Sequence, residues 1–192
     1  MKYDKEMILK NISFIIQKGT KVTIAGRTLI DNHDISQIST KCLRDNISYI
    51  SQNPYIFADT VRNNITLGNN EITDKQINDL IHEMGVENLF NKLNKGLDTK
   101  IKLSKLSYGE LQIIAFIRAI LHKANFYIFD EPTSNIDLQI EKMIQNIIDK
   151  ISKKSTVIII AHRKSTIESS DKIIYLKDGQ IDMIVNKDKV LN

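Results

Sequence analysis

Two adjacent carboxylates, Asp130 and Glu131, follow a short apolar segment at residues 126–129. Such a segment is typical of a buried β-strand, which would deliver both side chains to one end of a sheet. One carboxylate could bind a hard cation such as Mg2+, which prefers carboxylate and phosphate oxygens. The other could polarise an attacking water as a general base. Acidic turns after strands are common, so the pair alone leaves a structural interpretation open.

Two further polar residues follow apolar segments of the same kind. His162 comes directly after residues 156–161, and Gln52 follows residues 47–50. Ligands of open α/β sheets bind beyond the carboxyl ends of the strands, so His162 could lie near the acidic pair and near a phosphate. A lone histidine is more often structural or merely exposed, and Gln52 by itself is a loop residue.

A segment with helical spacing that ends near His122 opens with Ser107, Gly109 and Glu110. Backbone N–H groups at the start of a helix attract phosphate. The sequence therefore offers a possible anion site in addition to the acidic pair.

The elements that must position these residues alternate along the chain. We expect strands at residues 11–16, 21–25, 28–30, 47–50, 126–129, 156–161 and 172–176, and helices at residues 74–84, 86–93, 107–122, 138–151 and 165–169. The alternation of strands and helices after residue 125 predicts a largely parallel sheet with covering helices. The expected fold class is α/β, with a β-rich N-terminal part and a helical middle.

Composition excludes several classes of protein. The 192 residues fit one domain at about 150 residues per domain. A hydrophobic share of 42%, a charged share of 26% and 2 prolines exclude a disordered or collagen-like chain. Lys and Arg number 27 against 23 Asp and Glu and are scattered, so no nucleic-acid partner is expected. The single Cys42 indicates a reducing compartment, and no apolar stretch approaches the roughly 20 residues of a membrane helix.

Five motifs, in their order and spacing, resemble the nucleotide-binding domain of ABC transporters. The segment LSYGE resembles the signature motif of that family, YIFDE its Walker B segment, SNID its D-loop, IIAHR its switch-histidine loop and ISQNP its Q-loop. The run FADTVRNNI after the Q-loop is similar to the exporter branch. The resemblance covers nearly the whole chain and implies a P-loop NTPase-like cassette with an inserted helical subdomain and a largely parallel core sheet.

The resemblance also implies roles for the residues around one nucleotide. Glu131 would be the general base, and His162 would sense the γ-phosphate. Asp130 and Gln52 would hold Mg2+, and Gln52 would also link the nucleotide to the contact with a transmembrane domain. Tyr3 would stack on adenine.

Other roles that the resemblance implies concern a second cassette, because ABC dimers enclose ATP between two subunits. Ser107 and Gly109 would meet the γ-phosphate of a nucleotide held mainly by the partner cassette, and Asp137 would lie at the dimer interface. The implied partners are a transmembrane subunit and a second cassette, identical or different. The implied location is the cytoplasm, at the inner face of a membrane.

The phosphate loop of this family is missing from the sequence. A G-x-x-x-x-G-K-[ST] loop supplies backbone N–H groups, a lysine and a hydroxyl to phosphates and Mg2+, but no Gly-Lys-Ser or Gly-Lys-Thr occurs here. Against the family pattern about 20 residues, the loop and most of its following helix, are absent next to Gly26. Gly26 is either the first glycine of the loop or the glycine before the next strand. The lost burial is on the order of 10 kcal/mol.

Other departures from the family are milder. Tyr108 stands at a signature position where glycine is usual, residues 102–105 lack the acidic, Gly-containing stretch of exporters, and the first strand of the family is absent. We therefore expect one truncated domain over residues 1–192, with a helical subdomain at about 55–122. Three interpretations stay open: an exporter-type ABC ATPase component with impaired catalysis, a non-catalytic cassette that completes the ATP site of a partner, and a non-functional gene remnant.

Overall fold

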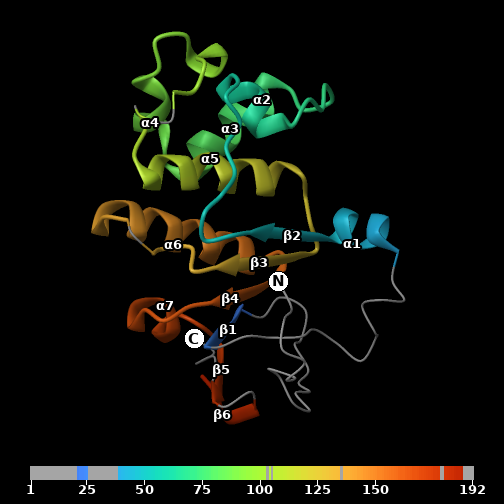
Figure 1. Ribbon diagram of the computed structural model, residues 1–192, viewed down its shortest axis with the longest axis vertical. Helices are drawn as coiled ribbons and strands as arrows, with labels where there is room; N and C mark the ends of the chain where they lie inside the picture. Colours follow the sequence, from blue (N-terminus) through green and yellow to red (C-terminus); the bar gives the residue numbers. More distant parts are fainter. Residues whose placement is uncertain are drawn as a thin grey trace, which may run out of the picture.

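A computed structural model of the chain describes residues 21–25, 39–102, 104, 106–134, 136–177 and 180–187. Its centre is a sheet whose order is β2-β3-β4-β1-β5-β6 (Figure 1). The strands are β1 (Lys21–Ala25), β2 (Ile47–Ile50), β3 (Phe126–Asp130), β4 (Thr156–Ile160), β5 (Lys172–Lys177) and β6 (Gln180–Asn186). The pairs from β2 to β5 are parallel, and β5 with β6 is antiparallel. The prediction of a largely parallel sheet is confirmed.

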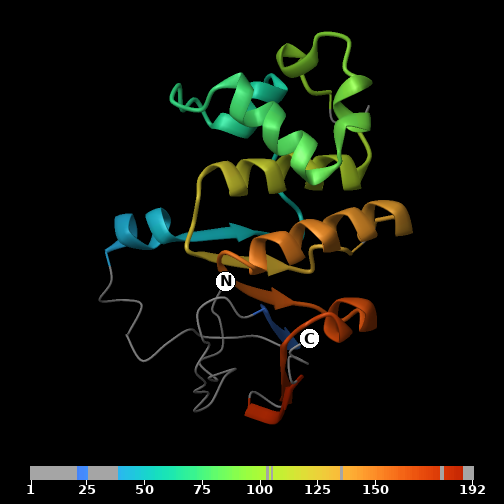
Figure 2. The same ribbon diagram turned by 180° about the vertical axis from the view of Figure 1, so that it is seen from behind.

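Helices cover the sheet and form a group beyond it. They are α1 (Thr40–Asn46), α2 (Val61–Thr66), α3 (Asp74–Met84), α4 (Glu87–Asn91), η2 (Gly96–Asp98), α5 (Tyr108–Leu121), α6 (Leu138–Ser152) and α7 (Lys164–Glu168). Helix α5 lies between the sheet and the group formed by α2, α3 and α4 (Figures 1 and 2). No helix within the described ranges combines the length and the apolar composition of a membrane span.

Local signals explain why the helix at residues 74–84 is predicted with its exact ends. Thr73 caps α3 through its side chain, which accepts from the Gln76 N–H, and Gln76 accepts in return from the Thr73 N–H. Gly85 ends the helix in the left-handed conformation, with φ 70°, which glycine adopts without strain. Residues next to the helix therefore determine both ends of α3.

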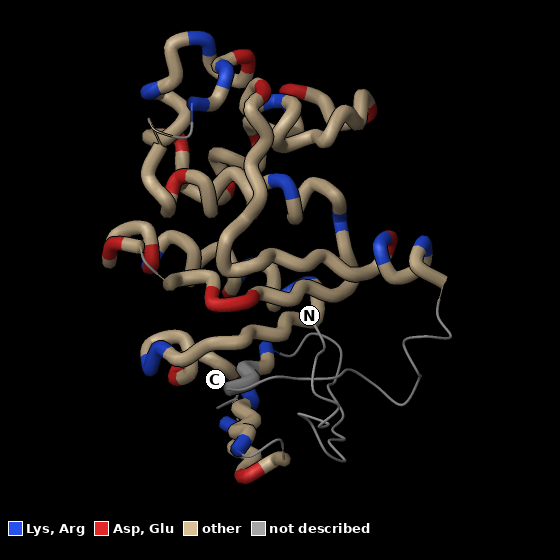
Figure 3. Tube along the Cα trace, in the orientation of Figure 1, with Lys and Arg blue, Asp and Glu red and all other residues tan. Residues whose placement is uncertain are grey.

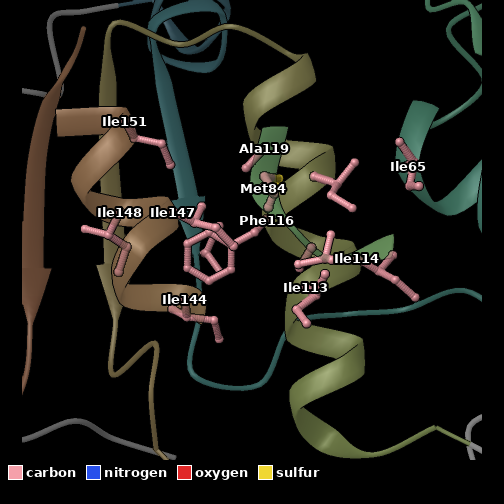
Figure 4. Packing of buried hydrophobic residues seen from close by; sticks show 14 of the residues in the cluster. Ile65, Met84, Ile113, Ile114, Phe116, Ala119, Ile144, Ile147, Ile148 and Ile151 are labelled. Atoms are coloured by element: carbon pink, nitrogen blue, oxygen red, sulfur yellow. The ribbon is translucent and has the colours of Figure 1, made fainter. Parts of the chain in front are cut away.

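The core lies where α5 and α6 pack together beside the sheet. Figure 4 shows isoleucines of α6 on one side of Phe116 and side chains of α5 on the other. Ile144, Ile147, Ile148 and Ile151 recur at helical spacing and are all buried. The Phe116 ring of α5 lies 5.0 Å from the ring of Phe129 in β3, between centroids. Packing of α5 and α6 thereby fixes the end of β3 that carries the acidic pair.

Four elements have no counterpart among the predicted ones, namely α1, α2, η2 and β6. Helices α1 and α2 are 7 and 6 residues long, too short for a clear period of apolar residues. Strand β6 is exposed at many positions and owes its conformation to pairing with β5. The helix predicted at residues 86–93 ends earlier, at Asn91. The strands predicted at residues 11–16 and 28–30 lie outside the described residues.

Basic and acidic residues are intermixed along the described chain (Figure 3). Some of them form ion pairs across elements, such as Arg62 of α2 with Asp98 of η2, whose Nε and Oδ1 lie 3.0 Å apart. Other pairs lie within one helix, such as Lys41 with Asp45 in α1. Charges of opposite sign therefore lie next to each other at these positions.

Candidate functional site

The sheet brings Gln52, the acidic pair and His162 to one edge. Strands β2, β3 and β4 are parallel neighbours, and their last residues pair as Ile50 with Phe129 and Asp130 with Ile160. The loops that follow these strands must therefore begin side by side. This confirms that the polar residues at the strand ends lie together.

Glu131 is the centre of the cluster. Gln52 Nε2 donates a hydrogen bond to Glu131 Oε2 over 3.0 Å, and His162 Nε2 lies 3.4 Å from Glu131 Oε1. The Glu131 side chain is 29% exposed, whereas that of His162 is 70% exposed. The carboxylate is therefore contacted on both oxygens, and the imidazole faces solvent.

The backbone of Glu131 sets the direction of this carboxylate. Its φ is 47°, in the left-handed region that residues other than glycine rarely adopt. The Glu131 N–H donates to the Ile160 carbonyl over 2.8 Å, which ties the turn to β4. Strain of this kind persists where the surrounding contacts hold it in place.

Asp130 has a partner that the sequence did not reveal. Tyr49, near the end of β2, donates its hydroxyl to Asp130 Oδ2 over 2.9 Å. Burial raises the pKa of the Tyr49 hydroxyl above its usual value of 10.0, and the hydrogen bond to Asp130 raises this pKa further. Tyr49 is an ordinary strand residue in the sequence, and only the pairing of β2 with β3 places it beside Asp130.

Ser107 caps the helix that the signature-like segment opens. Its Oγ accepts from the Glu110 N–H over 3.2 Å, and Glu110 Oε2 accepts from the Ser107 N–H over 2.8 Å. This capping box fixes the first turn of α5 and leaves Ser107 exposed. The Ser107 hydroxyl hydrogen is still available to donate to a ligand.

Gly109 lies where α5 touches α6. A Cβ atom on Gly109 would come within 2.8 Å of Ile140 Cγ2, closer than real side chains approach. Gly109 therefore permits close packing of the two helices. The contact with phosphate predicted for it remains a prediction.

Tyr108 and Gln112 join the start of α5 to the loop that carries Gln52. The Tyr108 hydroxyl donates to Asn53 Oδ1 over 3.2 Å. Gln112, which is fully buried, donates from Nε2 to the Gln52 carbonyl over 3.0 Å. No local pattern singles out Asn53 or Gln112, because their partners are distant in the chain.

Asp137 caps α6 and lies on the surface. Its Oδ1 accepts from the N–H groups of Gln139 and Ile140, each over 2.9 Å. A turn that includes Glu131 precedes it, in which the Ser134 hydroxyl donates to the Glu131 carbonyl over 3.0 Å. The segment between the acidic pair and α6 is therefore anchored at both ends.

Glu141 supports the segment that follows His162. It is largely buried in α6, accepts from the Ser165 hydroxyl over 2.7 Å and pairs with the Arg163 guanidinium. Arg163 is the residue next to His162, so this contact fixes the backbone from which the imidazole projects. No local sequence pattern connects Glu141 with His162.

Two predicted site residues, Tyr3 and Gly26, lie outside the described residues. A cavity of about 590 Å3 is found beside the Gln52 loop, and Tyr49, Tyr55, Arg118 and His122 are part of its lining. Tyr55 is 71% exposed. An aromatic, partly basic hollow thus borders the site.

Comparisons with known proteins agree with this architecture. The family model described as ABC transporter matches residues 8–134. A Rickettsia typhi protein that carries the name of an export ATP-binding/permease protein is 42% identical over 81% of this chain and 27% of its own length. An ATP-dependent lipid A-core flippase of Syntrophus aciditrophicus is 34% identical over 93% of this chain and 34% of its own length.

The solved structure of a bacterial Atm1-family ABC exporter with ATP bound superposes with a TM-score of 0.84 at 27% identity. The match covers 96% of this chain and 37% of the exporter chain. This chain thus spans about a quarter to a third of the length of the two relatives.

Proposed function

The chain belongs to the ABC transporter family as an exporter-type cassette, and we propose that it acts in an assembly that couples ATP binding and hydrolysis to transport across a membrane. The observation that carries the proposal is the cluster in which Gln52 and His162 contact both oxygens of Glu131. In this proposal Glu131 is the general base for the attacking water, and His162 contacts the γ-phosphate. Positioned donors of this kind are what phosphoryl transfer requires.

The proposal includes impaired catalysis in this chain's own site. The sequence contains no Gly-Lys-Ser or Gly-Lys-Thr. The alignment with the flippase extends over 203 residues, whereas 93% of the 192 residues of this chain is only about 179. The flippase thus has about 24 aligned positions without a counterpart here, the difference between 203 and 179. This difference supports the absence of a segment as long as a phosphate loop with part of its helix.

The residues present fit the metal better than they fit the nucleotide. Family membership implies ATP binding, and Asp130 and Gln52 carry oxygens that would suit Mg2+ at the sheet edge. No Gly-Lys-Ser/Thr sequence offers the lysine and the N–H cradle that grip the phosphates. The donor set therefore does not fit tight binding of ATP by this chain alone.

Two partners complete the proposal. A second cassette, identical or different, would face Ser107 and Asp137, both of which are exposed. A transmembrane domain would contact the aromatic hollow beside Gln52, placing the chain at the cytoplasmic face of a membrane. The helical subdomain at about 55–122 would carry the signature helix between the two partners.

Calorimetric titration of the purified chain with MgATP tests the impairment. We expect no saturable binding at micromolar nucleotide, because the groups that would neutralise the phosphates are missing. A dissociation constant in the micromolar range would contradict the proposal. A cooperative thermal unfolding transition of the same sample would contradict the interpretation as a non-functional remnant.

The capped and exposed Ser107 favours a second candidate function, a non-catalytic cassette that completes the ATP site of a partner. Mixing the chain with the cassette of the Syntrophus flippase, at limiting flippase cassette, should then raise the ATPase rate. A matched pair of variants sharpens the test. Ser107→Asn keeps a capping oxygen without charge, whereas Ser107→Asp keeps the cap and repels phosphate. The stimulation should survive Ser107→Asn far better than Ser107→Asp. No heterodimer and no change in rate would refute this role.

A further inference from the structure

The first turns of α5 hold the Gln52 loop at two successive residues. The Tyr108 hydroxyl donates to Asn53 Oδ1 over 3.2 Å, and Gln112 Nε2 donates to the Gln52 carbonyl over 3.0 Å. Gln112 Nε2 also lies 3.5 Å from the Tyr108 hydroxyl oxygen. Two side chains of one helix face thus meet the loop together.

Gln112 is a buried polar residue whose side chain contacts the Gln52 carbonyl. It has no exposed surface, and within the described residues its Oε1 has no hydrogen-bond partner. A buried acceptor without a partner is unfavourable. The contacts of its Nε2 with the loop and with Tyr108 explain why a polar side chain occupies this position.

The same loop reaches Glu131. Gln52, whose carbonyl Gln112 holds, donates from its own side chain to Glu131 Oε2 over 3.0 Å, while His162 lies at the other oxygen. A continuous chain of hydrogen bonds therefore runs from α5 through Gln52 to the carboxylate. Hydrogen bonds in such a network strengthen one another.

Tyr108 departs from the residue that is usual in the family. Glycine is usual at that signature position, and glycine has no side chain to reach Asn53. The Tyr108 side chain is partly buried, and its hydroxyl reaches the Gln52 loop of the same subunit through the hydrogen bond to Asn53. The tyrosine therefore adds a contact between the signature segment and the Q-loop of the same subunit.

We propose that Tyr108 is a positioning residue that holds the Q-loop against α5 and thereby keeps the Gln52 amide on Glu131. We call the hydrogen bond between Tyr108 and Asn53 the latch. Its functional meaning rests on the proposed function, in which Glu131 is the general base. Because Gln52 is held from α5, a displacement of α5 relative to the sheet withdraws the amide from the carboxylate. In the arrangement described, the Gln52 amide occupies one oxygen of the proposed general base.

Relaxation of the 15N side-chain amide of Gln52, measured by NMR on the full chain without nucleotide, tests the latch. In the unmodified chain the order parameter of this amide should lie near that of rigid groups, about 0.85. Tyr108→Phe, which removes only the hydroxyl, should lower it toward about 0.6, the upper limit for flexible groups, because one of the two described hydrogen bonds from α5 to the loop is lost. Asn53→Ala, at an exposed loop position, should have the same effect, and the double variant should add nothing further.

Tyr127→Phe is the matched control. It also removes one tyrosine hydroxyl, which accepts from the Ala124 N–H over 3.2 Å, far along the chain from the Q-loop. This control should leave the Gln52 amide unchanged, whatever it does to the thermal unfolding temperature. An unchanged Gln52 order parameter in both Tyr108→Phe and Asn53→Ala would overturn the latch. The measurement needs neither ATP nor a partner, so failure of the proposed function would leave its outcome unaffected.

Discussion

At the scale of the residue, the site depends on how each polar group is held. Glu131 adopts a left-handed backbone, with φ 47°, and both its oxygens are contacted. Asp130 is held by Tyr49, and the backbone beside His162 by the contacts of Glu141. The identities of the acidic pair and the histidine suggest chemistry, and these supporting contacts give them their geometry.

His122 provides a prediction of pH dependence at this scale. Partial burial lowers the pKa of its imidazole below the usual 6.5, and the nearby positive charge of Arg118 lowers this pKa further. The unfolded chain therefore binds a proton at His122 more readily than the folded chain does. We expect the free energy of unfolding to fall as the pH decreases below about 6.5.

The histidine resonances measure this directly, because the chain has only 4 histidines. The His122 ring should titrate below 6.5 in the folded chain, and His122→Gln should flatten the acid side of the stability profile. An unchanged profile in His122→Gln, together with an ordinary pKa, would exclude this source of acid sensitivity.

At the scale of the element, the approach of α5 to α6 depends on Gly109. Gly109→Ala would place a Cβ within 2.8 Å of Ile140 Cγ2, and overpacking of this kind costs about 1–3 kcal/mol. The better helix propensity of alanine offsets at most about 1 kcal/mol. We expect a net loss in the free energy of unfolding, measured with urea.

The control is Ile140→Ala, which removes the side-chain atoms that the new Cβ would meet. Ile140→Ala should lower the free energy of unfolding less in the Gly109→Ala background than in the unmodified chain. Additive effects of the two substitutions would show that the close approach of the helices does not explain Gly109.

The start of α6 gives another element-scale prediction. Asp137 Oδ1 accepts from the N–H groups of Gln139 and Ile140, so Asp137→Ala should lower the free energy of unfolding by about 1 kcal/mol. Asp137→Ser retains a capping oxygen and should preserve most of the stability. Equal losses for Ala and Ser in urea unfolding would argue against a capping role.

At the scale of the whole molecule, the proposed defect lies at one junction of the chain. Insertion of the corresponding phosphate-loop and helix segment of the Syntrophus flippase between Gly26 and Arg27 should confer saturable MgATP binding. It should also raise the thermal unfolding temperature, because the inserted helix would bury apolar side chains worth roughly 1.5–3 kcal/mol each.

The control for the insertion carries alanine in place of its phosphate-loop lysine. This version should keep the gain in stability but bind MgATP much more weakly, since the lysine neutralises the phosphates. If the complete insertion stabilises the fold and binds no MgATP, the impairment has a source other than the missing loop.

Much of the fold could be predicted from the sequence because its signals are local. The α3 helix is predicted with its exact ends, since Thr73 and Gly85 stop it on either side. Strands β2 and β5 follow from short apolar runs. Helix α2 was missed because its 6 residues hold too few apolar positions to show a period.

The sequence by itself determined the family, the element types and the residues whose chemistry suits phosphate and metal. It did so because motifs, caps and apolar periodicity lie within a few residues of one another. Only the tertiary structure decided that Tyr49 meets Asp130, that Gln112 meets the Gln52 carbonyl, and that Gly109 lies against Ile140. These contacts join residues that are distant in the chain, so they depend on strand order and helix packing, which no local pattern records.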